Sequence, residues 1–384
     1  MAVGHSDDID VVDAVSSVVD QCARSLAGVP PKAGLLLCTY DIDLPPLIRG
    51  VRDAFPDIEL VGTTAAGEMS SVLGFREDSV MLALFASDSV DITAGSASGV
   101  MGSPGDAARR AVDQALGKTE LQPRLCIAVP CITGDDPTIL LRELHRALGD
   151  DVPVIGGGSA PRTAPGEPLV ARQFHDDRIL EDAASVLLFS GPLSYSFGID
   201  TGWQPIGSKG TVTESAGNII LGIDDEPALS FYQRYLGPEG KPTPANPLAV
   251  FEDDGDDFYL RVPFTADAAG AIRLTGGIPA DSAVQLTVAG TDEIFAGARS
   301  AVRRAVERFP EGSAPEAALV FSCAIRRLVL GTRTGAELDI ARSELGDAIP
   351  VGGFYCFGEI APIESGATRF HNETIVALLL GEAA

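Results

Sequence analysis

I-P-V-G-G-F-Y-C-F-G-E-I-A-P-I-E-S-G-A-T-R-F-H-N-E-T-I-V-A-L-L-L, which spans Ile349 to Leu380, is the most informative stretch of this chain. It contains an apolar strand that runs into small residues, one carboxylate at Glu359, and a second apolar strand at the end. Burial of an unpaired carboxylate is costly, so Glu359 predicts a specific partner or a ligand.

Two earlier loops have the same character. Small residues follow a predicted apolar strand in G-T-T-A-A-G-E at 62–68 and in G-G-G-S-A-P at 156–161, as they do in G-G-F-Y-C-F-G-E at 352–359. Ligands of α/β proteins tend to bind beyond strand ends, where small residues let backbone N–H groups approach. The same glycines also suit tight turns and close packing, and both interpretations stay open here.

Longer segments repeat as well. Val90–Gly95 is similar to Val284–Ala289, and Ala107–Asp113 is similar to Ala301–Glu307 at the same separation along the chain. The glycine pair at 156–157 likewise corresponds to the pair at 352–353. Similar segments in the same order predict an internal duplication.

The alternation of helices with wholly apolar strands predicts an α/β fold with strands covered on both faces. We expect three related helix–strand–helix–strand–strand units with mixed sheets. The first unit begins near residue 6, with Ser6 as the N-cap of a helix that ends at Ala27. A mainly antiparallel, β-rich segment, Gly191–Ala283, lies between the second and third units, with a hairpin tip at 253–257.

Composition excludes several classes of function. The net charge of −26 over 384 residues disfavours nucleic acid and anionic membrane surfaces, which need clustered Lys and Arg. No apolar run is long enough to span a bilayer and no signal peptide is evident, so we expect a cytoplasmic protein. The six cysteines form no Cys-x-x-Cys pair, which predicts reduced, buried thiols, no metal site and no cofactor.

The C-terminal motifs resemble a known family. G-F-Y-C-F-G-E-I-A-P at 353–362 and T-R-F-H-N-E-T at 368–374 are similar to the signature of the FIST C-terminal domain, and F-S-C-A-I-R at 321–326 lies where that family places a Cys-x-x-Arg. The resemblance implies an intracellular sensory protein that binds a small ligand such as an amino acid. A separate signalling protein is then a possible partner.

The N-terminal motifs agree with this resemblance. V-G-T-T-A-A-G-E at 61–68, G-W-Q-P-I-G at 202–207 and G-N-I-I-L-G-I-D-D-E-P-A-L at 217–229 resemble the FIST N-terminal domain and its junction with the C-terminal domain. The resemblance implies a FIST N-terminal domain at 31–225, which holds two of the units, and a FIST C-terminal domain at 226–372.

Candidate ligand contacts cluster around these motifs. Glu359 suits a ligand ammonium, whereas Arg326, Arg369 or the backbone N–H groups near Gly352 suit a ligand carboxylate. Either arginine is also a candidate structural partner of Glu359. The complete set of predicted ligand-binding residues is Thr63, Glu68, Cys323, Arg326, Gly352, Gly353, Gly358, Glu359, Arg369 and Asn372.

Two other functions remain open at this point. Cys323 with His371 and either Glu359 or Asp339 forms a possible nucleophile–base–orienter set, as in a Cys-dependent hydrolase or transferase. A protein-interaction scaffold without a small ligand is the second alternative. The prediction that we carry forward is a non-catalytic sensory protein that binds an amino acid or a similar small polar metabolite.

Overall fold

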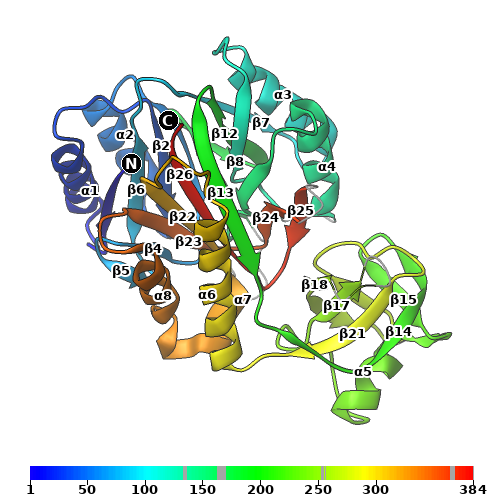
Figure 1. Ribbon diagram of the computed structural model, residues 1–384. Coiled ribbons are helices and arrows are strands. Elements are labelled where there is room, and N and C mark those ends of the chain that lie inside the picture. The colour runs from blue at the N-terminus through cyan, green and yellow to red at the C-terminus, as the bar shows by residue number, and fades with distance from the viewer. Residues whose placement is uncertain (133–135, 162–169, 252–254, 256, 364–367, 384) are drawn as a thin grey trace.

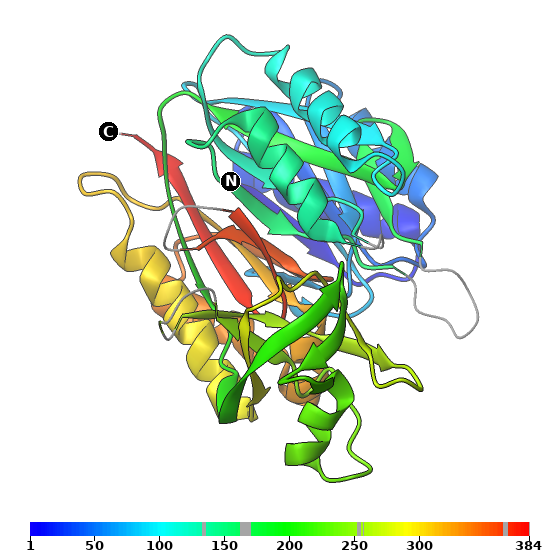
Figure 2. The ribbon, with the colours of Figure 1, turned by 90° about the vertical axis from the view of Figure 1, so that its right-hand side faces the viewer.

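The computed structural model describes residues 1–384 except 133–135, 162–169, 252–254, 256, 364–367 and 384. Three six-stranded mixed sheets form the body of the molecule, and an antiparallel lobe projects from one end of it (Figures 1 and 2). The α/β class predicted from the sequence is therefore confirmed. Most of the predicted hairpin tip at 253–257 lies outside the described residues.

The first sheet contains, in spatial order, β1 (Ala2–Ser6), β6 (Val80–Phe85), β2 (Ala33–Cys38), β3 (Glu59–Thr64), β10 (Arg172–His175) and β11 (Arg178–Glu181). Only β2 and β3 are parallel to each other, and every other neighbouring pair is antiparallel. Helices α1 (Val11–Leu26) and α2 (Leu44–Ala54) pack on its outer face through an apolar cluster.

The second sheet contains β7 (Asp91–Ser98), β12 (Ala183–Ser190), β8 (Pro123–Ala128), β9 (Val154–Gly157), β24 (Glu359–Pro362) and β25 (Thr368–His371). Its parallel pair is β8 and β9, in the same place in the order as the parallel pair of the first sheet. Helices α3 (Pro104–Leu116) and α4 (Pro137–Leu148) cover its outer face.

The third sheet contains β13 (Leu193–Asp200), β26 (Ile375–Glu382), β22 (Ala317–Cys323), β23 (Val351–Cys356), β4 (Glu68–Ser70) and β5 (Gly74–Arg76). Its parallel pair is β22 and β23. Helices α6 (Thr291–Glu307) and α8 (Ala336–Leu345) pack on its outer face, while α7 (Ala324–Leu330) and a short 3-10 helix (Gly331–Arg333) follow β22.

The three units exchange hairpins. The β4–β5 hairpin of the first unit completes the third sheet, β10–β11 of the second completes the first sheet, and β24–β25 of the third completes the second sheet. Each unit therefore depends on another unit for two of its strands.

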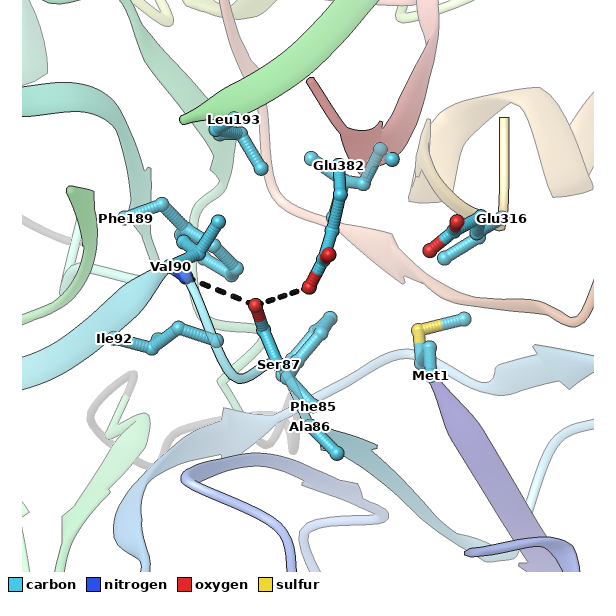
Figure 3. Close-up of a pocket in the computed structure, with 13 residues that line it drawn as sticks. Met1, Phe85, Ala86, Ser87, Val90, Ile92, Phe189, Leu193, Glu316 and Glu382 are labelled. Atoms are coloured by element: carbon cyan, nitrogen blue, oxygen red, sulfur yellow. Dashed lines mark hydrogen bonds between the residues drawn. The ribbon is translucent and has the colours of Figure 1, made fainter. Parts of the chain in front are cut away.

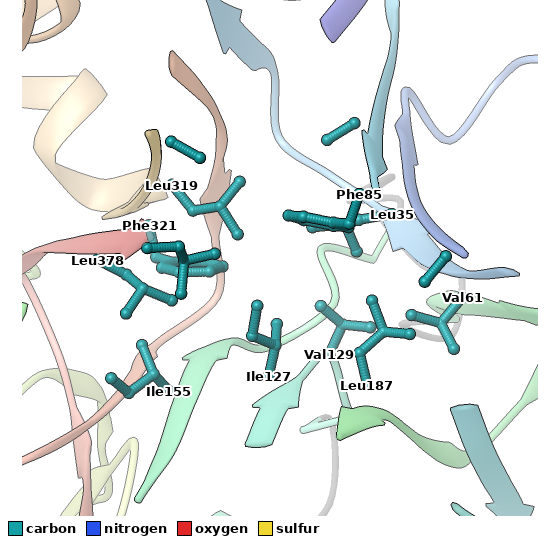
Figure 4. Close-up of a cluster of buried hydrophobic side chains, with 14 of the residues drawn as sticks. Leu35, Val61, Phe85, Ile127, Val129, Ile155, Leu187, Leu319, Phe321 and Leu378 are labelled. Atoms are coloured by element: carbon teal, nitrogen blue, oxygen red, sulfur yellow. The ribbon is translucent and has the colours of Figure 1, made fainter. Parts of the chain in front are cut away.

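The inner faces of the three sheets share one apolar core (Figure 4). Its members are wholly or almost wholly buried and come from every sheet, as Leu35, Ile127 and Phe321 illustrate. Burial of an aliphatic or aromatic side chain of this size stabilises the folded state by roughly 1.5–3 kcal/mol. The shared core thus joins the three units into one body.

Close strand packing explains three of the glycines that the sequence highlights. A Cβ atom on Gly62, Gly156 or Gly353 would lie 2.0, 1.9 or 2.0 Å from a carbonyl oxygen of the neighbouring parallel strand. No side chain fits at such a distance. At these three positions glycine is required for sheet packing. This agrees with the interpretation that the glycines of the strand-end loops allow close packing.

The antiparallel lobe contains β14 (Gln204–Ala216), β15 (Ile219–Ile223), β16 (Glu226–Pro227), α5 (Ala228–Leu236), β17 (Leu248–Phe251), β18 (Phe258–Arg261), β19 (Pro263–Ala266), β20 (Ile272–Leu274) and β21 (Ala283–Val288). All its strand pairs are antiparallel, and α5 packs on an apolar cluster of the lobe. The predicted β-rich segment is therefore present.

The lobe lies inside the third unit, whereas the sequence placed it before that unit. The difference arises because β13 pairs along its length with β26 and so belongs to the third sheet. Val284–Ala289 falls largely in β21 of the lobe. It therefore does not occupy the position that Val90–Gly95 occupies in the second unit. The predicted division between residues 225 and 226 falls within the lobe. The division and the internal duplication stay predictions.

The start of the first unit also differs from the prediction. Residues 2–6 form β1, which pairs with β6, and the first helix begins only at Val11. Asp10 caps this helix, because its Oδ1 accepts hydrogen bonds from the N–H groups of Val12 and Asp13 at 2.8 and 3.3 Å. Ser6 is therefore a strand residue and not a helix cap.

Candidate functional site

One buried polar side chain lies at the same position in each exchanged hairpin. Glu68, Gln173 and Glu359 each pair with the residue that directly follows one of the three packing-constrained glycines. All three side chains are fully buried. They belong to three different sheets, so the predicted contacts Glu68 and Glu359 are equivalent in position but do not lie in one site.

Glu359 is held by its own unit. Its Oε2 accepts hydrogen bonds from the backbone N–H and the hydroxyl of Thr374 at 3.0 and 2.8 Å, and the Cys356 thiol donates to Oε1 at 3.3 Å. Burial raises the pKa of Glu359 to about 7, while these hydrogen bonds and Arg326 act in the opposite direction. The predicted direct pairing of Glu359 with Arg326 or Arg369 does not appear among the contacts of Glu359.

Arg326 is saturated by protein acceptors. Its Nε and Nη2 donate to Glu337 Oε1 at 2.9 and 2.6 Å, and its remaining donors bind the carbonyl oxygens of Thr201, Ile294 and Glu373. A guanidinium has five N–H donors, and all five are used. The prediction that Arg326 binds a ligand carboxylate therefore conflicts with this geometry.

The Arg326–Glu337 ion pair has a complete polar environment. Both side chains are inaccessible to solvent. Glu337 Oε2 accepts hydrogen bonds from the hydroxyls of Ser322 and Tyr355 at 2.9 and 2.6 Å. Such pairs are stable only when their remaining lone pairs and protons are also satisfied. The pair is best described as a structural support beneath the end of β22.

Glu373 is the unexpected residue of this region. It connects β25 to β26 in a left-handed backbone conformation, with φ of 56°, which is uncommon outside glycine. Its carbonyl oxygen accepts hydrogen bonds from Thr201 Oγ1 at 2.8 Å and from Arg326 Nη1 at 3.2 Å. Within the described part of the chain, both of its carboxylate oxygens are buried and have no hydrogen-bond partner.

Burial has a strong effect on this carboxylate. It raises the pKa of Glu373 well above the usual range, Arg326 lowers it, and the charge of Glu359 raises it further. Buried polar groups in folded proteins almost always have a partner, so each exception asks for an explanation. A protonated carboxyl, poised for a cation, is one such explanation.

Glu373 lies where the lobe joins the body. Thr201 belongs to the connection from β13 to the lobe, and Thr275 of the lobe donates a hydrogen bond to the Asn372 side chain. We call this junction the neck, and define it as residues 201–203, residues 372–374 and the side chain of Arg326. Figure 1 shows the chain leaving the body after β13 and continuing into the lobe.

Two further buried polar groups near the neck are unsatisfied in the part of the chain that the structure describes. They are Tyr232 Oη on α5 and Trp203 Nε1. Burial, and then the charge of Glu373, raise the pKa of Tyr232, so these two groups interact electrostatically. The Trp203 ring lies 5.9 Å from Arg326 Cζ. The neck and the adjacent helix α5 therefore supply one acidic acceptor and two neutral donors.

Asn372 and Arg369 connect the body to the lobe. Asn372 is almost fully buried, and its side-chain oxygen accepts the hydrogen bond from Thr275. Arg369 lies on β25, with its Cζ 5.9 Å from the ring of Tyr259 on β18. The structure thus brings Cys323, Arg326, Glu359 and Asn372 together near Glu373, and places Arg369 at the adjacent contact.

Other predicted residues lie elsewhere. Thr63 Oγ1 donates to the carbonyl of Arg172 at 3.1 Å on the first sheet. Glu68 accepts a hydrogen bond from Ser79, and burial raises its pKa to about 8. The backbone of Gly352 and Gly353 is engaged in sheet pairing inside β23.

Gly358 has a conformational role. It adopts a φ of +91° in the turn before Glu359, and a Cβ there would clash with the ring of Phe370. Gly67 occupies the matching place before Glu68, with φ of +114°. Both glycines are required by the turn, whether or not a ligand binds nearby.

The surroundings of Cys323 and His371 do not favour the nucleophile hypothesis. Burial raises the pKa of Cys323 well above its usual value, so the thiolate is disfavoured. His371 Nε2 lies 3.0 Å from the carbonyl oxygen of Ala361, and burial lowers its pKa to about 4. Asp339 is exposed on α8. The three side chains therefore do not form an activated set.

A small pocket of about 50 Å³ lies at the other end of the sheets (Figure 3). Phe85 and Phe189 line it, and Ser87 donates a hydrogen bond to Glu382 beside them. Phe85 pairs with Ala33 at the start of β2, so this pocket lies at the edge opposite the strand ends. It is therefore separate from the neck.

Among the described residues, no group of three or more His, Cys, Asp or Glu side chains is arranged to hold a metal ion. No helix in the same part of the chain is long and apolar enough to cross a membrane.

Comparison with known proteins identifies the family. The three-sheet body with its inserted lobe defines an α/β protein with a buried polar junction between body and lobe. The model of the FIST N domain matches residues 32–226 and that of the FIST C domain matches residues 228–362. The chain belongs to the FIST family, whose domains are associated with small-ligand sensing in signal transduction.

Other comparisons add little. No curated protein matches the chain. A cyanuric acid hydrolase from A. caulinodans is similar at 9% identity and a TM-score of 0.37, over 100% of this chain and 99% of that one. A chorismatase is similar at 9% identity and a TM-score of 0.35, over 94% and 95% of the two chains. Similarity at this level carries no conclusion about function.

Proposed function

We propose that this FIST protein is a non-catalytic sensor that binds a small polar metabolite at the neck. The ligand carries an ammonium group, as an amino acid or a related compound does. Glu373 accepts the ammonium, and Glu359 adds negative charge behind it. This assignment moves the main ligand contact from Glu359, which already has protein partners, to Glu373, which has none among the described residues.

The observation that carries the proposal is the unpartnered carboxylate of Glu373. An ionised carboxylate buried without a partner costs several kcal/mol, so the ligand-free protein holds a proton there. A ligand ammonium replaces that proton and forms a charge-assisted hydrogen bond, which is stronger than a neutral one.

The position of the neck provides a route from binding to signalling. Glu373 belongs to the body, whereas Tyr232 belongs to the lobe. A ligand that contacts both sides favours one arrangement of lobe and body over another. A separate signalling protein then reads the difference, since a ligand shifts a conformational equilibrium by its differential affinity for the two states.

Thermal unfolding against a panel of amino acids and related metabolites tests this function. A ligand that binds only the folded state at a hundredfold excess over its Kd stabilises the protein by about 2.7 kcal/mol. We expect a rise in Tm of a few degrees for the wild-type protein and no rise for Glu373→Gln. Asp182→Asn, which changes an acidic residue in a comparable turn of the second unit, is the matched control and responds like wild type.

Two results would overturn the proposal. If no compound of the panel stabilises the protein, the proposal of a small-ligand sensor is rejected. A ligand that stabilises Glu373→Gln as much as wild type places binding away from the neck.

A further inference from the structure

We propose that the ligand bound at the neck is a primary amine that has no free carboxylate. This inference rests on the proposed function and narrows its ligand class, from zwitterionic metabolites to cationic ones. It follows from the charges and hydrogen-bond donors that surround Glu373.

The charges near Glu373 are unbalanced. The neck and its supporting residues contain the carboxyl groups of Glu337, Glu359 and Glu373 and the guanidinium of Arg326. Glu337 and Arg326 neutralise each other in their buried ion pair. Glu359 and Glu373 therefore remain without an ion-pair partner among the described residues. An ammonium that replaces the proton on Glu373 leaves the net charge of the neck unchanged, whereas a zwitterion adds a negative charge beside Glu359.

A ligand carboxylate also lacks a strong donor at this site. All five N–H groups of Arg326 already bind protein oxygens. Arg261 donates to the carbonyl oxygens of Leu260 and Phe370 at 3.0 Å each, and Arg369 has an interaction of its own. A buried carboxylate is tolerated when it is paired with a cation, and the nearby cations are engaged.

Two neutral donors remain beside Glu373. They are the N–H of Trp203 and the O–H of Tyr232, both buried and without a partner in the described residues. Neutral donors suit a hydroxyl, carbonyl or amide oxygen, because such an oxygen carries no full negative charge that a cation would have to balance.

Apolar side chains border the same region. Trp203 packs with Ile294 and Leu330, and Tyr232 packs in the apolar cluster of the lobe. An alkyl or aryl group attached to the ammonium would therefore have apolar side chains of both the body and the lobe as neighbours. The structure thus points to an organic amine in preference to ammonia or a metal cation.

Amino-acid amides isolate the feature that matters. Phenylalaninamide, valinamide and argininamide keep the side chain and the ammonium of the parent amino acid but lack its carboxylate. Phenethylamine, isobutylamine and agmatine lack the carboxyl carbon altogether. The experiment measures Kd by calorimetry for each amino acid, its amide and its amine, on the full wild-type chain at neutral pH.

We expect at least one amide or amine to bind at least about tenfold more tightly than the amino acid with the same side chain. A tenfold difference in Kd corresponds to about 1.4 kcal/mol, which is less than the cost of burying one uncompensated charge. The affinity should be lost in Glu373→Gln and retained in Asp182→Asn.

The outcomes separate this inference from the proposed function. Amino acids that bind as tightly as their amides, with affinity that depends on Glu373, overturn the amine inference and leave the sensor in place. The absence of binding in all three compound classes overturns both. Because the comparison is made on the wild-type protein, a variant that fails to fold does not affect the result.

Discussion

Glu373 and Asp182 occupy the same turn in two different units, but only the carboxylate of Asp182 has a partner. Each precedes the last strand of its unit in a left-handed conformation, with φ of 56° and 52°. Asp182 is half-buried, and its Oδ1 accepts a hydrogen bond from the N–H of Met101 at 2.7 Å. The strained turn is therefore common to both units, whereas the unpartnered carboxylate belongs to Glu373 and supports a role in binding.

Replacement of Glu373 by Gln should stabilise the ligand-free protein at alkaline pH. The folded-state pKa of Glu373 is raised, so its contribution to stability is lost as pH rises above the unfolded value of about 4.3. Gln resembles the protonated acid and does not titrate. We expect the advantage of the variant in free energy of unfolding to grow by more than about 1.4 kcal/mol, the value of one pKa unit, between pH 5 and pH 8.

Urea unfolding of both proteins at the two pH values measures this difference. Asp182→Asn is the control and should change stability by the same amount at both pH values. A Glu373→Gln protein that is less stable than wild type at both would show that the carboxylate stabilises the fold.

The wild-type protein should lose stability between about pH 6.5 and pH 8. Burial raises the pKa of Glu359 to about 7 and that of Glu68 to about 8, so the folded state binds more protons than the unfolded state in this range. His5 and His371, with pKa values lowered to about 4, act in the opposite direction only between about pH 4 and 6.5.

The slope is at most about 1.4 kcal/mol per pH unit for each carboxyl group. Chemical denaturation across this range measures it, and the double variant Glu68→Gln/Glu359→Gln should flatten the curve. A wild-type stability that increases from pH 6.5 to 8 would contradict the predicted protonation of these two groups.

Loss of Arg326 should destabilise the neck strongly. Arg326→Met leaves Glu337 buried without its cation and releases three carbonyl oxygens, which predicts a loss of about 3–5 kcal/mol in the free energy of unfolding. Arg109→Met, which removes an exposed ion pair with Asp106, should change stability by about 1 kcal/mol or less.

Denaturant titration compares the two variants. In the double variant Arg326→Met/Glu337→Met, the loss should be smaller than in Arg326→Met alone, because no buried charge is left unpaired. Equal effects of Arg326→Met and Arg109→Met would show that Arg326 is not the buried support described above.

The cysteines should be unreactive in the folded protein. All six cysteines are buried, and burial raises the pKa of Cys323 and Cys356. We expect a thiol reagent such as Ellman's reagent to modify them only at the rate of unfolding. Rapid, stoichiometric modification of Cys323 in the native protein would revive the hypothesis of a Cys-dependent enzyme.

Much of the fold was predictable because local signals agree with the final structure. The small residues after the buried strands mark strand ends correctly, and the close approach at Gly156 and Gly353 explains why glycine occurs there. The exchange of hairpins was not predictable, because it depends on pairing between strands far apart in the chain. Strand β13 was assigned to the wrong segment for the same reason: its partner β26 is the last strand of the chain.

The candidate site was harder to predict than the fold. Arg326 was predicted as a ligand contact, whereas in the structure it forms an ion pair with Glu337 that depends on how α7 and α8 pack. Gln173 was missed since an amide gives no sign of being equivalent to Glu68 and Glu359. Glu373 lies within the quoted T-R-F-H-N-E-T motif, yet glutamate rarely adopts a left-handed conformation, so no sequence pattern indicated its buried turn.

The central claim is that a ligand ammonium replaces the proton on Glu373, and calorimetry in buffers of different ionisation enthalpy measures that proton directly. At neutral pH, binding to the wild-type protein and to Asp182→Asn should release about one proton per ligand, because the free carboxyl is protonated and the bound one is not. Glu373→Gln should show neither the affinity nor the release. Tight binding without proton release, or with release that persists in Glu373→Gln, would contradict the role of Glu373.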